Sequence, residues 1–308
     1  GRPYGVDIVM PATVPTEGTP VDLGTLIPAG HREFVERTLT ELGVPPLPDG
    51  DGGRDGVLGW LHSVARSHVD VALKHPIALI ANALGSPPPD VIARAHADAV
   101  PVAALAGTAA HAQRHVDAGV DVVVAQGYEA GGHTGEIASM VLLPEVVDAV
   151  GDRAPVLAAG GIGTGRQIAA ALALGADGVW MGSTWLTTAE YTLGGPSSAT
   201  QRALLAAGSS DTVRSKIYTG KPARLLKTRW TRAWEAPEAP APLPMPLQNL
   251  LVSAAHERIM RSGDPDVVAM PVGQIVGRMN QVRPVAEVFA DLLRELDETL
   301  DRLQNRRS

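Results

Sequence analysis

The sequence predicts an α/β protein built on a parallel sheet, of the TIM (β/α)8-type barrel class. From His75 onward, short runs that are apolar on both faces alternate with segments of helical composition. Such runs are typical of parallel strands that helices cover on both sides. Two successive runs, at residues 155–159 and 178–181, both end in glycines, which places two bare backbone turns side by side at one edge of the sheet.

Six strands are expected, each a short apolar run bounded by turn residues: residues 1–10, 77–83, 101–106, 120–126, 155–159 and 178–181. Helices are expected between the later strands, where apolar residues recur at helical spacing: residues 89–98, 108–119, 142–150 and 165–174. A closed barrel of this class needs eight strands. Because the first strand begins almost at Gly1, we expect two further βα units to have preceded this sequence and the barrel to be incomplete at its N-terminal side.

The remaining segments are predicted to surround the sheet. Helical patterns at residues 31–42 and 57–73 lie in a long insertion, at about residues 12–74, which we expect to cap one end of the domain. We therefore predict a barrel domain at residues 1–232. Residues 233–308 are expected to supply a linker, a lid near residues 270–277 and helices at 248–261 and 284–303 that pack on the barrel. A homodimer contact through the last helix is the alternative.

The two glycine turns predict a phosphate cradle. Glycine lets backbone amides approach a phosphate closely, and the N-terminus of the helix at 165–174 adds a favourable dipole. A dinucleotide fingerprint fits less well, because Arg166 stands where its third glycine belongs and no acidic residue ends the next strand. The spacing favours the paired phosphate site in the last two loops of a (β/α)8 barrel.

The loop after the fourth strand carries the candidate chemistry. It holds His133 between glycines, and histidine is the side chain whose usual pKa lies nearest neutrality. At the carboxyl end of a strand it can donate or accept a proton beside a bound substrate. Glu129 is expected to hold the loop through backbone hydrogen bonds.

Three stretches resemble the nitronate monooxygenase family, formerly called 2-nitropropane dioxygenases. They are Gln126-Gly-Tyr-Glu-Ala-Gly-Gly-His-Thr-Gly135, Ala158-Ala-Gly-Gly-Ile-Gly-Thr-Gly-Arg166 and Gly175-Ala-Asp-Gly-Val-Trp-Met-Gly-Ser-Thr184. The family also includes FMN-dependent enoyl-ACP reductases and NAD(P)H:quinone reductases. The resemblance runs from Tyr4 to about Arg229 and implies an FMN-containing TIM barrel.

The resemblance also implies site residues. His133 is the implied catalytic histidine. Residues near the flavin ring or ribityl chain would be Gln126, Ala130, Gly131 and Gly132, and residues around the phosphate would be Ala159, Gly160, Gly161, Gly182 and Ser183. The implied activity is oxidation of alkyl nitronates with O2 to carbonyl compounds and nitrite. Two alternatives stay open: NAD(P)H-dependent reduction of enoyl thioesters or quinones, and an incomplete barrel without activity.

Composition excludes other classes. The chain has 308 residues, a formal net charge of −7 and no cysteine. Negative charge argues against a nucleic-acid partner, and the lack of cysteine excludes disulfides and thiolate chemistry. No apolar run is long enough to span a membrane and no signal peptide opens the chain, so a cytoplasmic protein is expected.

Two polar clusters have simpler interpretations. His111 and His115 lie four residues apart on a predicted helix, a spacing that can bind zinc, but without an evident third ligand we expect no metal site. A basic run at residues 214–232 is interpreted as a solvated loop, with an anion-facing wall as the alternative.

Overall fold

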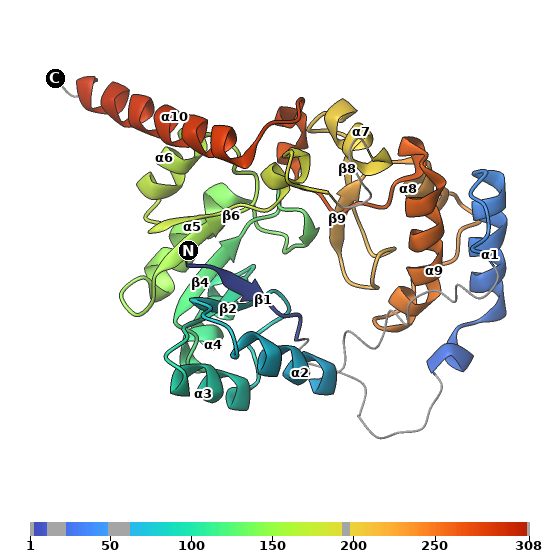
Figure 1. Ribbon diagram of the computed structural model, residues 1–308, viewed down its shortest axis with the longest axis horizontal. Coiled ribbons are helices and arrows are strands. Elements are labelled where there is room, and N and C mark those ends of the chain that lie inside the picture. Colours follow the sequence, from blue (N-terminus) through green and yellow to red (C-terminus); the bar gives the residue numbers. More distant parts are fainter. Residues whose placement is uncertain (1–2, 11–22, 49–61, 193–197, 307–308) are drawn as a thin grey trace.

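The structure is a computed structural model that describes residues 3–10, 23–48, 62–192 and 198–306. Its largest element is a parallel sheet of six strands in the order β1-β2-β3-β4-β6-β7 (Figure 1). The strands are β1 (Gly5–Asp7), β2 (Leu79–Asn82), β3 (Val102–Ala106), β4 (Val122–Gln126), β6 (Val156–Ala159) and β7 (Gly178–Trp180). The six predicted strands and the parallel α/β class are confirmed.

Helices follow the strands as expected for βα units. They are α3 (Pro89–Ala97), α4 (Ala109–Asp117), α5 (Ser139–Val150) and α6 (Gly165–Ala173). The strands between them consist mainly of valine and alanine, whose short side chains are almost fully buried. Helix α5 begins at Ser139, three residues before the predicted start at Leu142. The Glu129 carboxylate accepts the Ser139 backbone N–H and hydroxyl, which satisfies the first turn of this helix.

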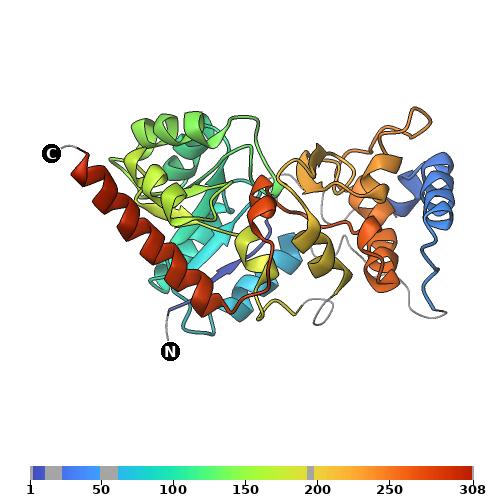
Figure 2. The same ribbon diagram turned by 90° about the horizontal axis from the view of Figure 1, so that it is seen from above.

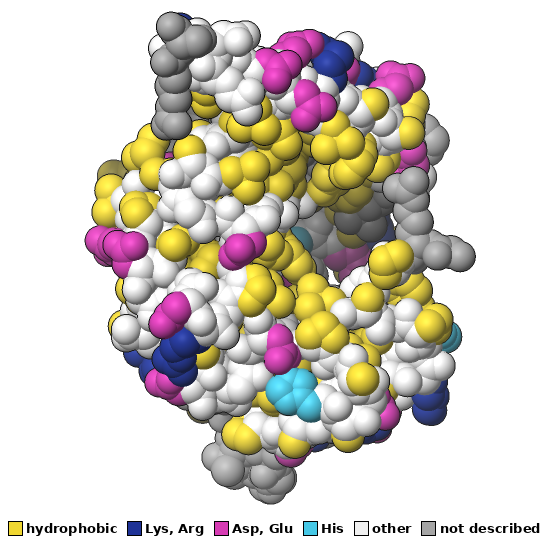
Figure 3. All heavy atoms as spheres, turned by 90° about the vertical axis from the view of Figure 1, so that its left-hand side faces the viewer, with side chains coloured by type: hydrophobic (Ala, Val, Ile, Leu, Met, Phe, Trp, Pro, Cys, Tyr) yellow, Lys and Arg dark blue, Asp and Glu magenta, His cyan; other side chains and the backbone are white. Residues whose placement is uncertain are grey.

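The sheet curls into a half-barrel, with β1 and β7 as its edges in the part of the chain that the structure describes (Figures 1 and 2). Figure 3 shows the face at the left of Figure 1, where a hollow opens and hydrophobic side chains gather around it. No described helix is long and apolar enough to cross a membrane.

A second, smaller sheet was not predicted. It pairs β5 (Gly132–His133), β9 (Ala223–Leu226) and β8 (Thr212–Ser215) in antiparallel fashion, and α8 (Arg229–Ala233) follows. Interpreting residues 214–232 as a solvated loop is therefore wrong. All four residues of β9 are buried. Arg224 is among them, because its guanidinium packs on the Tyr128 ring rather than facing water.

The helices beyond this small sheet form a separate core. Helices α1 (Ala29–Glu41) and α9 (Leu247–Ser262) pack together around Phe34, Trp230 and Trp234. Helix α2 (His62–Ala72) packs instead against the parallel sheet. The predicted insertion thus contributes to both parts of the molecule, and its residues 12–22 and 49–61 lie outside the described residues.

Two further helices complete the fold. Helix α7 (Ala199–Ala206) lies beside the small sheet, and α10 (Val285–Asn305) packs lengthwise on α6 (Figures 1 and 2). Gly165 makes this packing possible, because a Cβ there would lie 2.2 Å from the Leu296 backbone nitrogen. The outer side of α10 exposes Phe289, Leu293 and Leu303.

Candidate functional site

A hollow of about 310 Å³ opens at the carboxyl edge of β4, β6 and β7. Gln126, Ala159 and Trp180 stand in register on these three strands and all line it. Its volume lies near the lower end of the roughly 300–1,000 Å³ typical of small-molecule sites. The carboxyl edge of a parallel barrel sheet is also where such sites form.

All nine residues that the sequence predicted to bind a cofactor line this one hollow: Gln126, Ala130, Gly131, Gly132, Ala159, Gly160, Gly161, Gly182 and Ser183. They come from three separate strand ends and the loops that follow them. Sequence reasoning missed the remaining lining residues, which are Leu105, Ile162, Trp180, Met181, Leu186, Pro271 and Ile275. Trp180 and Met181 precede Gly182 directly, so strand register could have placed them. Pro271 and Ile275 arrive from distant sequence.

Two of the glycines leave open space where a side chain would stand. A Cβ added to Gly132 or Gly182 would meet no atom within 4 Å. Gly160 and Gly161 have φ angles of 98° and 72°, a conformation that residues with side chains rarely adopt. At these four glycines the wall of the hollow is bare backbone, and a flat ligand can approach it closely there.

Gly131 has the opposite surroundings. A Cβ there would lie 2.6 Å from the Val272 carbonyl carbon and the Gly273 nitrogen. The 3-10 helix η5 (Gln274–Arg278) begins at this contact, and the Gln274 N–H donates to the Glu129 carbonyl oxygen at 2.9 Å. The glycine-rich loop therefore packs directly on the segment that carries Pro271 and Ile275.

The turn between β6 and α6 is held by side chains of its own helix. Gln167 accepts the Gly163 N–H at 3.0 Å and donates to the Gly161 carbonyl oxygen at 2.5 Å. The Thr164 hydroxyl caps α6 by accepting the Gln167 N–H. These bonds between the turn and α6 fix the conformation of the turn.

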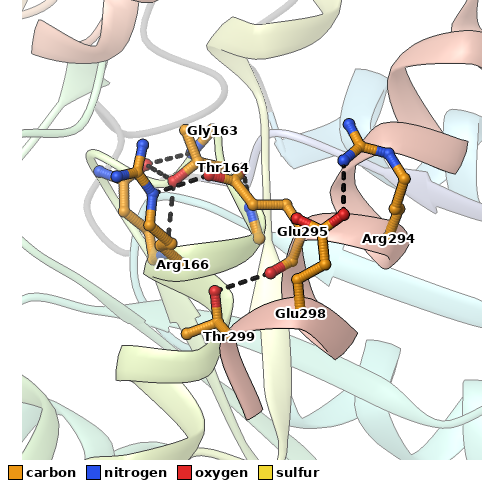
Figure 4. Close-up of polar contacts among 9 residues, drawn as sticks. Gly163, Thr164, Arg166, Arg294, Glu295, Glu298 and Thr299 are labelled. Carbon is orange, nitrogen blue, oxygen red and sulfur yellow. Dashed lines mark hydrogen bonds and ion pairs between the residues drawn. The ribbon is translucent and has the colours of Figure 1, made fainter. Parts of the chain in front are cut away.

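The N-terminus of α6 is occupied by the protein. Figure 4 shows Glu295 reaching from α10 to the start of α6, where its carboxylate accepts the Gly165 N–H at 2.9 Å and pairs with Arg166 at 2.7 Å. The sequence predicted that the N-terminus of α6 would help to hold an anion, but the Glu295 carboxylate already accepts the N–H group there. Glu295 places a negative charge there, so an anion in the hollow has to rely on amides nearer Gly160 and Gly182.

Glu129 acts as predicted, as a support for the loop. Its carboxylate accepts the Ser139 backbone N–H at 3.0 Å and the Ser139 hydroxyl at 2.9 Å. The Ser183 hydroxyl, which lines the hollow, accepts the Gly273 N–H at 2.9 Å. Ser183 thus connects the β7 loop to the segment before η5.

His133 lies on β5, next to the hollow rather than among its lining residues. Its Nε2 atom is 2.6 Å from the Thr219 hydroxyl oxygen. Burial, together with the nearby Lys221 ammonium, lowers the pKa of His133 to about 4. The imidazole is therefore neutral at pH 7.

Two arginines of the basic run hold the loop that carries His133. Arg224 donates to the Tyr128 carbonyl oxygen at 2.9 Å and lies 4.5 Å from the centre of the Tyr128 ring. Arg214 donates to the Thr134 carbonyl oxygen at 3.1 Å, and its guanidinium carbon lies 5.8 Å from the centre of the same ring. The basic run at residues 214–232 was the sequence signal for these arginines, whereas Tyr128 lies outside that run.

His115, one of the two histidines four residues apart, has a structural role. Its Nδ1 lies 2.7 Å from the Ser86 hydroxyl and its Nε2 lies 3.1 Å from the Leu105 carbonyl oxygen, so both ring nitrogens are engaged. Among the described residues, no group of three or more His, Cys, Asp or Glu side chains could hold a metal ion.

The chain is similar to several known proteins. The family model described as "Nitronate monooxygenase" matches residues 38–295. The Mycobacterium tuberculosis protein named "Putative monooxygenase Rv1533" is 51% identical, over 99% of this chain and 83% of its own length. A Staphylococcus aureus (strain Newman) protein named "Probable nitronate monooxygenase" is 30% identical, over 76% of this chain and 67% of its own length.

Solved structures agree with these relatives. The nitroalkane oxidase from Streptomyces ansochromogenes superposes with a TM-score of 0.78 at 31% identity, covering 98% of this chain and 82% of the other. FabK from Thermotoga maritima superposes with a TM-score of 0.67 at 25% identity, covering 97% and 96% of the two chains. Together with the fold and the loops around the hollow, these matches show that the chain belongs to the nitronate monooxygenase family of oxidoreductases.

Proposed function

We propose that this protein is an FMN-dependent nitronate monooxygenase that holds its flavin in the hollow at the ends of β4, β6 and β7. The observation that carries the proposal is that all nine residues implied to hold FMN line that single hollow. Sequence motifs alone imply those residues, and the fold brings them together from separate loops.

The chemistry of the hollow fits a flavin. None of the described residues that line it has an ionisable side chain, and Trp180, Met181, Ile162 and Ile275 supply apolar contact area. A flat aromatic ring system suits such a wall. The phosphate would lie against the backbone around Gly160, Gly161, Gly182 and Ser183, since Glu295 occupies the start of α6.

The proposed substrates are an alkyl nitronate and O2, and the products are a carbonyl compound and nitrite. When bound, FMN would supply the redox chemistry by which electrons pass from the nitronate to O2. The nitronate carries its negative charge on the nitro oxygens. A neutral His133 can donate a hydrogen bond to that group, and the Lys221 ammonium near His133 favours an anion there.

The similar protein from Streptomyces ansochromogenes is a nitroalkane oxidase, which supports a nitro compound as the substrate. The alternative, reduction of an enoyl thioester or quinone by NAD(P)H, would use the same hollow. The two activities differ in the electron donor, and a direct experiment separates them.

The experiment records the visible spectrum of the purified protein loaded with FMN, under anaerobic conditions. We expect flavin absorbance to bleach on addition of an alkyl nitronate and to return with O2, with nitrite released. Bleaching by NAD(P)H but not by nitronate would replace the proposal with the reductase. A protein that takes up no FMN would refute both.

A further inference from the structure

The Thr219 hydroxyl contacts the ring of His133, although the two residues are 86 positions apart. It lies in the connection between β8 and β9 and is fully buried. The next residue, Gly220, has a φ angle of 89°, and a Cβ there would lie 2.4 Å from the Met245 nitrogen. This connection is therefore packed tightly against residues 243–245, which gives Thr219 a fixed position.

The direction of the hydrogen bond follows from the surroundings of the hydroxyl. The Lys221 backbone N–H points to the Thr219 oxygen at 3.4 Å, so that oxygen already faces a donor. The hydroxyl proton needs an acceptor, and among the described residues His133 Nε2, at 2.6 Å, is the acceptor within hydrogen-bond distance. Thr219 then donates and Nε2 accepts.

The charges around the ring agree with this assignment. An imidazolium would carry a proton on Nε2 and could not accept from Thr219. The burial of the ring and, after it, the neighbouring Lys221 ammonium disfavour the charged form. A neutral imidazole whose Nε2 accepts a hydrogen bond carries its proton on Nδ1.

We propose that Thr219 is a positioning residue that donates its hydroxyl proton to His133 Nε2 and so holds the imidazole in the tautomer protonated at Nδ1. In that tautomer the Nδ1–H group is the hydrogen-bond donor of the ring, and Nε2 is not the base. The effect on turnover rests on the function proposed above, but the tautomer itself does not.

The test compares Thr219→Val, which keeps the shape and removes the hydroxyl, with Thr219→Ser, which keeps the hydroxyl. Nitrogen-15 NMR of histidine-labelled protein reports the tautomer of each imidazole, and His133→Gln identifies the His133 signals by their disappearance. Thr38→Val, at another buried threonine, controls for the loss of a buried hydroxyl in general. Turnover of an alkyl nitronate and flavin content are measured on the same preparations.

We expect Nδ1-protonated His133 in the unchanged protein, in Thr219→Ser and in Thr38→Val, and a mixture of tautomers in Thr219→Val. We also expect kcat/KM to fall roughly tenfold in Thr219→Val and to recover in Thr219→Ser, with flavin content unchanged, as the loss of one neutral hydrogen bond implies. An Nε2-protonated ring in the unchanged protein, or an unaltered His133 signal in Thr219→Val, would overturn the proposal. If the NMR spectra are as expected but no variant turns over an alkyl nitronate, Thr219 still sets the tautomer of His133, and only the proposed activity is refuted.

Discussion

The two parts of this molecule are built from different side chains. The core clusters of the parallel sheet and its helices contain alanine, valine, leucine, isoleucine and methionine, with no aromatic residue among those described. The core around α1, α8 and α9 is built on Phe34, Trp230 and Trp234. Small residues let parallel strands curl and let their loops approach one another closely.

The parallel sheet and the small antiparallel sheet also supply different kinds of residues to the candidate site. The parallel sheet contributes the bare backbone of Gly160, Gly161 and Gly182, together with uncharged side chains such as Trp180 and Met181. The small antiparallel sheet contributes side chains: His133 on β5, and Thr219 and Lys221 from the connection before β9. Cofactor binding and substrate chemistry should therefore respond to different substitutions. Three changes test this division, and a fourth tests the aromatic core.

The largest effect is expected from His133→Gln, which alters the side-chain part of the site. General acid–base or hydrogen-bonding catalysis by a positioned histidine contributes about 10²- to 10⁴-fold, and we expect kcat/KM for an alkyl nitronate to fall within that range. Flavin content should stay unchanged, because His133 does not line the hollow. Steady-state kinetics and the visible spectrum check this, and loss of flavin would contradict the division of roles.

Gly131→Ala alters the contact between the glycine-rich loop and the segment before η5. The new Cβ would lie 2.6 Å from backbone atoms of Val272 and Gly273, which cannot rotate away as a side chain can. We expect the free energy of unfolding to fall by about 1–3 kcal/mol and FMN affinity to fall with it. Chemical denaturation and flavin titration measure the two effects. An unchanged free energy of unfolding would show that the segment before η5 can shift to accommodate the new methyl group.

Gly182→Ala alters only the hollow. Its Cβ meets no protein atom within 4 Å, so the methyl group would occupy space left for the ligand. We expect FMN affinity to fall roughly tenfold, equivalent to about 1.4 kcal/mol, with little change in the stability of the flavin-free protein. Gly30→Ala in α1 is the matched control, since a Cβ there also meets no atom within 4 Å. Equal FMN affinity in both variants would remove Gly182 from the site.

His256→Phe alters only the aromatic part, and its effect at neutral pH should be the smallest. The His256 ring stacks on Tyr218 with centroids 5.1 Å apart, and burial lowers its pKa to about 4. Because the folded pKa lies below the usual value of about 6.5, protonation favours the unfolded chain, and stability falls as the pH drops from about 6.5 towards 4. His133 adds a loss in the same range.

We expect His256→Phe to keep the stacking on Tyr218 and to reduce the fall in stability between pH 6.5 and about pH 4. Its stability at pH 7 should be nearly unchanged. Thermal unfolding followed from pH 7 to pH 4 checks the prediction. If the variant and the unchanged protein lose the same stability between pH 7 and pH 4, titratable groups other than His256 cause that loss.

Much of the parallel sheet could be predicted because its signals are local. Apolar runs marked all six strands, and glycines after residues 159 and 181 marked the loops that line the hollow. A glycine at a strand end acts through its own backbone, so its role can be inferred without knowing its neighbours.

Only the tertiary structure decided the contacts between distant segments. Thr219 meets His133, Glu295 caps α6, and Arg224 packs beneath Tyr128, in each case across more than 80 positions of sequence. No local pattern distinguishes these residues from solvated threonine, glutamate or arginine, because their partners are set by how the two parts of the chain pack. The sequence by itself therefore determined the backbone wall of the site, and the packing of the second part against it decided the side chains that complete it.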